Sequence, residues 1–234
     1  MVPLDRLLAG APEHRSRTGR PLVTLSYAQS LDGCIAARAG ERLALSGPES
    51  LQLTHRMRSM HDAILVGIGT LLADDPRLTV RHAPGRDPQP IVLDSHLRIP
   101  LEASLLQNPR PPWLACLETS NAGKAAELER LGALLLPLPP DSAGRVSTPA
   151  LLARLAGLGI DSLMVEGGAR VISAFLQQNQ VDRVVLTVAP LFLGGLPAVG
   201  QDLFTASSYP RLQEMGAEQM GNDLILWGSL DSSV

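Results

Sequence analysis

The segment EGGARVISAF, residues 166–175, places a carboxylate and two glycines where a predicted strand gives way to a predicted helix. Glycines at such a junction let a ligand approach the backbone, and the free amides at the start of the helix favour a phosphate. A carboxylate at the carboxyl end of a buried strand lies where open α/β sheets bind their ligands. The pattern alone is equally compatible with a tight turn, because the segment is neither a P-loop nor a G-x-G-x-x-G fingerprint.

The segment GIGTLLADDPRLTVR, residues 67–81, follows a second predicted strand and also begins with glycines that clear space beside the backbone. Thr70 and Asp74 are four residues apart, so they share one face of a short helix. Asp75 then points in another direction, and we interpret it, with the proline that follows, as the end of that helix. Arg81, taken alone, is best interpreted as a solvated surface charge.

Two further motifs carry polar side chains that are suited to a site. The sequence SLDG at residues 30–33 favours a tight turn between strands, and a plain hairpin turn explains it well. Arg56 and Arg58 are two residues apart on a predicted helix, so at most one of them faces a site. We expect His55 and His61 to lie on the surface.

The composition indicates a globular protein with a substantial core. The chain has 234 residues, of which 45% are hydrophobic and 18% are charged, and disordered chains are poorer in apolar residues. The formal net charge is −3, whereas proteins that bind nucleic acids or membrane surfaces usually carry a basic face. We therefore expect neither a nucleic acid nor a membrane as partner.

The two cysteines, Cys34 and Cys116, have no CxxC spacing, so we expect reduced thiols and no structural zinc site. The motifs of serine hydrolases, zinc proteases and zinc deaminases are absent from the sequence, and we expect no metal. The N-terminal residues lack the long apolar core of a signal peptide, and no stretch approaches the roughly 18 to 20 apolar residues of a membrane helix. We therefore expect a cytoplasmic protein.

Strands and helices alternate along most of the chain. Short apolar runs predict strands within residues 22–28, 62–70, 90–95, 112–120, 133–139, 161–168, 181–195 and 222–230. Helical patterns occupy residues 46–60, 70–75, 121–132, 147–159 and 169–179. Ser46 and Glu49 have the spacing of a capping box, with Pro48 in the first turn. Thr148 is the expected cap of a later helix, which begins with a proline.

This alternation predicts an α/β fold of three layers, in which helices cover both faces of a mostly parallel mixed sheet. No helix separates the last strands, so we expect an antiparallel edge at the C-terminus. Residues 1–20 are rich in Arg, Gly and Pro and are expected to form a partly ordered lead-in. Residues 21–234 contain no internal repeat and no Gly/Ser-rich linker, and they are predicted to form a single domain.

The motifs occur together in an order that resembles one family. The stretches SLDG, VGIGTLLADDPRLTVR, PIVLDS, VEGG and VDRVVLTVAPLFLGG are similar, in order and spacing, to those of the riboflavin-biosynthesis pyrimidine reductases. The resemblance covers roughly residues 21–229 and implies a dihydrofolate-reductase-like fold and a homodimer. It also implies NADPH-dependent reduction of the ribosylamino group of a phosphorylated pyrimidine, 5-amino-6-(5-phosphoribosylamino)uracil, to a ribitylamino group. The zinc deaminase domain often fused to this reductase does not precede the matched motifs.

The resemblance also implies roles for particular residues. The positions that resemble contacts to NADP are Ala28, Thr70, Asp74, Ser95, Gly168, Ala169, Arg170, Val171, Ile172, Ser173 and Ala174. The positions that resemble contacts to the substrate are Arg58, Leu78, Arg81 and Glu166. Arginines suit the ribose phosphate, and Glu166 could bind hydroxyls or move a proton as a catalytic residue.

One departure and two alternatives stay open. Relatives often carry a serine and, two residues later, a tryptophan that lies against the cofactor, whereas this chain has Arg42 and Ala44. The alternatives are a reductase of the same fold acting on the 2,5-diamino-pyrimidinone analogue or another pterin-like compound, and a non-catalytic nucleotide-binding paralogue. The pattern places no basic residue beside a ribose 2′-phosphate, so it does not separate NADPH from NADH.

Overall fold

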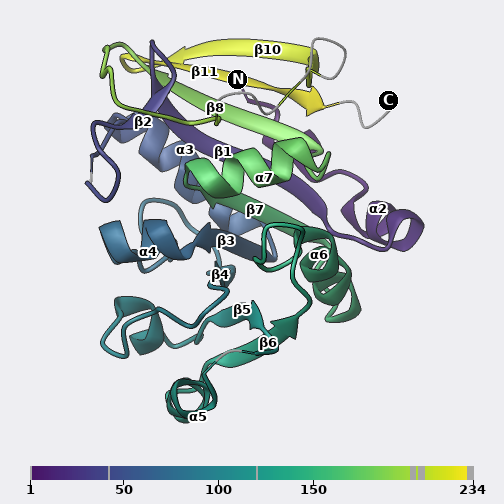
Figure 1. Ribbon diagram of the computed structural model, residues 1–234. Coiled ribbons are helices and arrows are strands. Elements are labelled where there is room, and N and C mark those ends of the chain that lie inside the picture. Colours follow the sequence, from purple (N-terminus) through teal and green to yellow (C-terminus); the bar gives the residue numbers. More distant parts are fainter. Residues whose placement is uncertain (1, 42, 120, 201–203, 205–208, 231–234) are drawn as a thin grey trace.

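The computed structural model describes residues 2–41, 43–119, 121–200, 204 and 209–230, and its main feature is a sheet of nine strands (Figure 1). The strands are β1 (Leu22–Ser30), β2 (Cys34–Ala36), β3 (Ala63–Gly67), β4 (Gln89–Leu93), β5 (Trp113–Leu117), β6 (Leu134–Leu138), β7 (Ser162–Gly167), β8 (Arg183–Ala189), β9 (Leu196–Pro197), β10 (Leu212–Met220) and β11 (Asp223–Leu230). The helices are α1 (Leu4–Leu7), α2 (Ala11–Thr18), α3 (Pro48–Met60), α4 (Ile68–Asp74), the 3-10 helix η1 (Ser104–Gln107), α5 (Ala122–Arg130), α6 (Thr148–Gly157) and α7 (Ala169–Gln177).

The sheet runs in the order β10-β11-β8-β1-β7-β3-β4-β5-β6, and the neighbouring strands from β8 to β6 are parallel. Strand β11 pairs antiparallel with β8, and β10 pairs antiparallel with β11. Strands β2 and β9 form a separate, short antiparallel ladder. The predicted α/β class, with a mostly parallel mixed sheet and an antiparallel C-terminal edge, is therefore confirmed.

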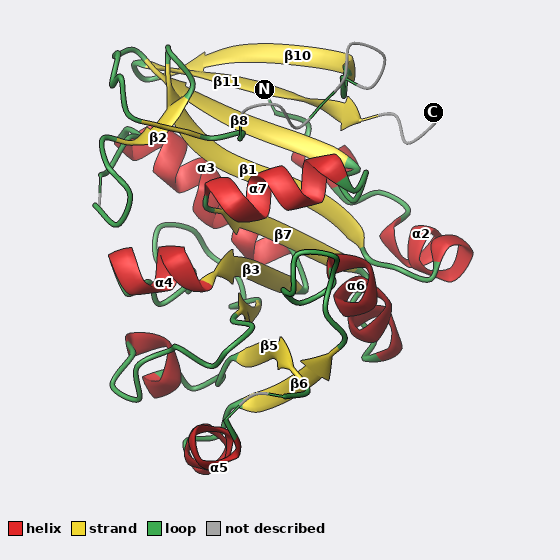
Figure 2. Cartoon of the chain, viewed as in Figure 1, coloured by secondary structure: helices red, strands yellow, loops and turns green. Residues whose placement is uncertain are grey.

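Each face of the sheet has its own hydrophobic core. On one face, Leu65 of β3 belongs to a cluster with Leu155 of α6 and Phe175 of α7. The neighbouring residues Ile64 and Val66 belong to a second cluster, which α4, η1 and α5 cover. Figure 2 shows α6 and α7 in front of the sheet and α3 behind it. Because a strand sends successive side chains to opposite faces, burying both faces requires helices on both, which gives the three predicted layers.

The sequence pattern does not predict strand β10, in which polar and apolar residues are mixed and more than half of the residues are exposed. Its backbone pairs with β11 from Leu212 opposite Leu230 to Met220 opposite Asp223, across a turn in which Gly221 has a φ of 62°. Pairing with β11 therefore defines this edge strand, and Leu212 and Met220 at its two ends pack against the cores. Among the described helices, none combines the length and the apolar character needed to traverse a bilayer.

The lead-in is more ordered than its composition indicates. Helices α1 and α2 occupy most of it, and Val2, Leu4 and Leu7 are buried in a cluster with residues of α3, β7, β8 and β11. Arg20 fixes its end by donating two hydrogen bonds, of 2.7 and 2.8 Å, to the carboxylate of Asp182. The expectation of partial order was wrong, because three apolar side chains and this bidentate ion pair tie the segment to the sheet.

Two predicted helix caps are wrong by one residue. The N-cap of α3 is Gly47 instead of Ser46, and the Gly47 amide donates a 2.7 Å hydrogen bond to the Asp223 carboxylate of β11. The N-cap of α6 is Ser147, and Thr148 is the first helical residue. A partner from a distant strand replaces the local capping box of α3, which is why the local pattern misplaced the cap.

Both histidines expected on the surface are completely buried. The His61 ring lies between the Met57 carbonyl, 2.7 Å from Nδ1, and the Thr24 hydroxyl, 2.9 Å from Nε2. A carbonyl oxygen only accepts, so Nδ1 carries the proton and Nε2 accepts from Thr24. Burial disfavours the charged ring and lowers the pKa of His61 to about 4. The expectation failed because the polar atoms of the ring find partners inside the core.

We expect His61 to make stability depend on pH. Its pKa is about 4 when folded against 6.5 in the reference state, so between these values the unfolded chain binds more protons. Stability should therefore fall as the pH drops from 6.5 to 4, by about 3 kcal/mol for this one residue. His61→Gln should remove about 1.4 kcal/mol per pH unit of the slope in urea unfolding. Equal slopes in both proteins would contradict the assignment.

Candidate active site

The carboxyl ends of four adjacent parallel strands, β1, β7, β3 and β4, meet at one edge of the sheet. From β1 the chain passes to β3 and then outward to β6, and β7 returns between β1 and β3. Strand β8 is then added on the other side of β1. This reversal of direction is a topological switch point, and open α/β sheets bind ligands outside the carboxyl ends of the strands at such a point.

A buried ion pair lies at the end of β7. Arg58 donates from Nε and Nη2 to the two carboxylate oxygens of Glu166, each over 2.6 Å, and from Nη1 to the Thr79 carbonyl over 3.1 Å. Burial opposes the charge of Arg58, but the charge and hydrogen bonds of Glu166 outweigh it and raise the pKa of the guanidinium. Arg56 is exposed, so the two arginines of α3 separate as their spacing predicts.

The pair limits what Glu166 can do. Both of its oxygens accept hydrogen bonds from Arg58, and each carboxylate oxygen keeps a further lone pair for another donor. The remaining lone pairs of a carboxylate can accept charge-assisted hydrogen bonds, which suits hydroxyl groups of a sugar. To transfer a proton, Glu166 would have to take it at one of these remaining lone pairs.

The glycines after β7 are required by packing within the protein. Gly167 has a φ of 68°, and a Cβ there would lie 2.6 Å from the Ile172 side chain. Gly168 has a φ of 113°, and its Cβ would lie 2.6 Å from the Thr70 hydroxyl. That hydroxyl donates a 2.7 Å hydrogen bond to the Gly167 carbonyl, which joins α4 to the end of β7. The tight turn and a ligand site are therefore compatible, because the turn brings α7 up to the strand ends.

In the segment 67–75, some positions pack against the rest of the protein and others face open space. The space beside Gly67 is filled by Val171, 2.7 Å from a built Cβ, so the expected ligand space is absent there, whereas nothing lies within 4 Å of a Cβ at Gly69. Asp75 adopts the left-handed conformation that ends α4, and its carboxylate accepts from the Ser104 amide at 2.9 Å and hydroxyl at 2.6 Å. The interpretation of Asp75 as a structural residue is confirmed.

The stretch from Leu78 to Arg81 runs beside the ion pair. Leu78 is 2% exposed and packs in the core, so only its backbone is available to a ligand. Arg81 is exposed, and its guanidinium makes one 3.3 Å contact with the Thr79 hydroxyl. Because the Thr79 carbonyl accepts from Arg58, the structure brings Arg58, Arg81 and Glu166 into one neighbourhood.

His55 is a residue of this neighbourhood that the sequence analysis missed. Its Nδ1 accepts a 3.0 Å hydrogen bond from the Arg81 amide, so Nε2 carries the proton. Burial, followed by the charges of Arg58 and Arg81, lowers its pKa to about 4, so the ring is neutral at pH 7. The spacing of three residues from Arg58 was the available signal, because residues i and i+3 share a helix face.

The remaining predicted cofactor positions fall on three elements. Thr70 and Asp74 lie on α4, as expected, and Ala28 lies in β1 opposite Thr187 of β8. Ser95 follows β4, and its hydroxyl accepts a 3.1 Å hydrogen bond from the Val146 amide. Of the two departures from the family pattern, Arg42 lies outside the described residues and Ala44 is exposed.

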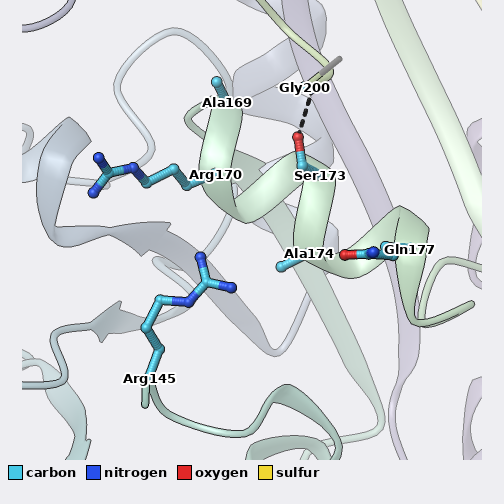
Figure 3. A pocket seen from close by; sticks show the side chains of 7 residues that line it. All are labelled: Arg145, Ala169, Arg170, Ser173, Ala174, Gln177 and Gly200. Carbon is cyan, nitrogen blue, oxygen red and sulfur yellow. Dashed lines mark hydrogen bonds between the residues drawn. The ribbon is translucent and has the colours of Figure 1, made fainter. Parts of the chain in front are cut away.

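The stretch Gly168–Ala174 presents one face to the core and the other to a cavity. Val171 and Ile172 are buried in the core, so their side chains do not face a ligand. A cavity of about 240 Å³ lies against the other face and is lined by Arg145, Ala169, Arg170, Ser173, Ala174, Gln177 and Gly200 (Figure 3). Two guanidinium groups suit a phosphate, so this cavity is a candidate site for a phosphoryl group.

The SLDG motif anchors a distant loop, which a plain hairpin turn would not do. Strands β1 and β2 belong to different sheets, and the Asp32 carboxylate accepts from the amides of Leu193 at 3.0 Å and Gly194 at 2.6 Å. It also accepts from the Ser30 hydroxyl. The bond from Ser30, followed by those from the two amides, holds the pKa of Asp32 well below its usual range. Asp32 therefore ties the loop after β8 to the end of β1.

We expect Asp32→Ala to loosen this loop. The amide protons of Leu193 and Gly194 lose their acceptor, and their exchange with solvent should accelerate by roughly tenfold or more. Hydrogen exchange resolved to these amides measures the effect, with Asp5→Ala, at an exposed position, as the control. Unchanged exchange at both amides would show that the loop is held by other contacts.

The fold defines a class of protein: an α/β domain built on a mostly parallel mixed sheet, with a candidate ligand site at the switch point of that sheet. The chain belongs to the family of the RibD C-terminal domain, whose model matches residues 21–226. It is 36% identical over 214 residues to the 2,5-diamino-6-ribosylamino-4(3H)-pyrimidinone 5′-phosphate reductase of Methanothermobacter thermautotrophicus, which covers 88% of this chain and 97% of that protein.

Two solved structures show the fold. The diaminohydroxyphosphoribosylaminopyrimidine deaminase/5-amino-6-(5-phosphoribosylamino)uracil reductase of Thermotoga maritima superimposes with a TM-score of 0.77 at 25% identity, over 94% of this chain and 60% of that protein. Dihydrofolate reductase of Enterococcus faecalis, in complex with NADP(H), has a TM-score of 0.51 at 16% identity, over 90% of this chain and 97% of that one. The second likeness confirms the predicted dihydrofolate-reductase-like fold.

Proposed function

We propose that the protein reduces the ribosylamino group of a phosphorylated ribosylaminopyrimidine to a ribitylamino group in riboflavin biosynthesis, with NADPH as the reductant. The observation that carries this proposal is the buried Arg58–Glu166 pair, which lies beside Arg81 at the carboxyl end of β7. A sugar phosphate needs acceptors for its hydroxyls and a cation for its phosphate, and this neighbourhood supplies both. The family and the named relative support the same activity.

The three charged side chains have separate roles in this proposal. Arg81 is the exposed cation with a single weak contact, which suits it to anchor the ribose phosphate. Glu166 accepts hydrogen bonds from the sugar hydroxyls through the lone pairs that Arg58 leaves open. Arg58 has three of its five N–H groups engaged, so it orients Glu166 and keeps two donors for the substrate.

Reduction requires the ribose ring to open, which moves a proton from the exocyclic nitrogen to the ring oxygen. We assign this relay to Glu166, because it is a carboxylate at the proposed site with lone pairs that Arg58 leaves open. NADPH, when bound, would supply the hydride, and a proton from solvent would complete the amine. The residues that would hold it are Thr70 and Asp74 on α4, Ala28, Ser95 and the exposed face of residues 168–174, and their main contribution is positioning.

Two compounds that differ in the pyrimidine ring are candidate substrates. The sequence motifs favour 5-amino-6-(5-phosphoribosylamino)uracil, which the name of the Thermotoga maritima relative contains. The 2,5-diamino-pyrimidinone analogue is favoured by the relative that this chain matches over 97% of its length. A panel of both phosphates, followed by the loss of NADPH absorbance and by mass analysis of the product, separates them. NADPH binding without turnover of either compound would overturn the proposal in favour of the non-catalytic paralogue.

We also propose that residues 21–234 act as one reductase domain in a cytoplasmic homodimer. Strand β10 is an open edge of the sheet, and Met215 on it is 63% exposed. Open edge strands with exposed apolar side chains tend to be covered by a partner. Light scattering coupled to size-exclusion chromatography measures the mass in solution, and a monomer at micromolar concentration would overturn the dimer.

A further inference from the structure

The cavity against α7 has two basic side chains from separate parts of the chain. Arg170 is in the first turn of α7, and Arg145 is in the loop between β6 and α6. In Figure 3 the Arg145 side chain points from its loop toward α7, and the Arg170 side chain extends from the start of that helix. At about 240 Å³ the cavity has room for several water molecules, and therefore for a phosphoryl group.

The positive charge of this cavity is only weakly balanced. Arg170 is exposed and has no ion pair or hydrogen bond from its side chain within the described part of the chain. Arg145 contacts the Asp141 carboxylate at 3.5 Å, with 51% of the arginine side chain exposed. Exposed pairs of this kind are worth little, and Asp141 also accepts the amides of residues 143 and 145 within its own turn. An anion would therefore meet two available guanidinium groups.

The cavity adjoins the strand ends that form the candidate active site. Val146, next to Arg145, donates its amide to the Ser95 hydroxyl over 3.1 Å, which fixes this loop to the end of β4. Arg170 follows Gly168 by two residues, at the end of β7. The opposite wall is fixed by the Gly200 amide, which donates a 2.9 Å hydrogen bond to Ser173. Three separate segments therefore shape this cavity beside the switch point.

We propose that Arg145 and Arg170 bind the 2′-phosphate of the cofactor and thereby select NADPH over NADH. This inference rests on the proposed function. A phosphate monoester has three terminal oxygens and a charge near −2, so it can accept from two guanidinium groups at once. NADH has a neutral hydroxyl at this position and gains neither contact. The ribose phosphate of the substrate is the other source of a monoester, and the experiment below separates the two.

The first part of the experiment measures the binding of cofactor fragments in the absence of turnover. Adenosine 2′,5′-bisphosphate carries the 2′-phosphate, and 5′-AMP lacks it, so titration calorimetry of both reports the contribution of that group. Arg145→Ala and Arg170→Ala should each weaken binding of the bisphosphate by about tenfold or more while leaving 5′-AMP unchanged. Arg154→Ala, an exposed arginine on the outer face of α6, is the matched control and should change neither. Both variants are at exposed positions, so the fold should be intact.

The second arm measures kcat/KM with NADPH and with NADH. The wild-type preference for NADPH should fall by about tenfold or more in each variant, and the KM for the pyrimidine phosphate should stay constant. Unchanged bisphosphate affinity in both variants overturns the inference. A rise in the KM for the pyrimidine phosphate with an unchanged cofactor ratio overturns it too, and assigns the cavity to the substrate. Absence of turnover with either ring in the wild type defeats the proposed function but leaves the binding arm able to decide this inference.

Discussion

Arg58→Ala is expected to lower the free energy of unfolding by about 3 to 5 kcal/mol, because it leaves the Glu166 carboxylate half-buried without its counter-charge. Glu166→Gln should be destabilising for the complementary reason, since Arg58 is 9% exposed and would lose its anionic partner. Both variants should also lose about a hundredfold or more in kcat/KM, because the substrate loses an acceptor or its orienting group. Urea unfolding and the loss of NADPH absorbance measure the two effects.

A double variant that removes both charges separates the effect on stability from the effect on activity. In Arg58→Met/Glu166→Leu neither buried charge remains, and replacement of a buried ion pair by apolar residues of similar size is often neutral or stabilising. The double variant should recover most of the stability and none of the activity. Arg56→Ala, at the exposed arginine of the same helix, should change stability by less than about 0.5 kcal/mol. An active double variant would remove Arg58 and Glu166 from the proposed mechanism.

Gly168→Ala is expected to destabilise the protein by roughly 3 kcal/mol and to weaken binding of NADPH. Its φ of 113° and ψ of 146° lie in a region that only glycine adopts without strain. The new Cβ would also lie 2.6 Å from the Thr70 hydroxyl and would displace it from the Gly167 carbonyl. Because this contact joins α4 to the end of β7, the start of α7 should shift. Urea unfolding and titration with NADPH measure the two losses.

Two further variants test why Gly168→Ala should be destabilising. Gly157→Ala, in α6 with nothing within 4 Å of its built Cβ, should be neutral or stabilising by up to about 1 kcal/mol. Thr70→Ala removes the hydroxyl that a side chain at Gly168 would meet, so the double variant Thr70→Ala/Gly168→Ala should recover the steric part of the loss and keep the backbone strain. If Gly168→Ala were as stable as the wild type, residue 168 would not have the strained positive φ on which this prediction rests.

The sequence predicted the sheet well because strand and helix signals are local. Apolar runs such as DAILVG and DSLMVEGG have the length of buried strands, and β3 and β7 form within them. The signal was weak in β10, whose apolar residues do not alternate regularly along the strand, so this strand was missed. The cap at Gly47 was misplaced because its hydrogen-bond partner, Asp223, comes from a distant strand, and the cap at Ser147 differs from the predicted residue by one position.

The burial of single polar residues could not be predicted in the same way. His61 is in the core because Thr24, which is 37 positions away in the chain, lies opposite its ring. His55 is buried because the Arg81 amide meets it from another loop. The spacing of His55 from Arg58 was the one local signal, and the local pattern gives none for the burial of His61. Their partners come together only when α3 packs on the sheet.

By itself, the sequence determined the α/β class, the antiparallel edge and the order of the motifs at the strand ends, because hydrophobic period and turn chemistry are properties of neighbouring residues. Only the tertiary structure decided which residues meet. Arg58 and Glu166 are 108 positions apart, and Arg145 and Arg170 come from separate elements, yet each pair lies together at the ends of the parallel strands. Crossover connections bring distant segments to one edge of the sheet, and the partners of a charged side chain depend on that topology.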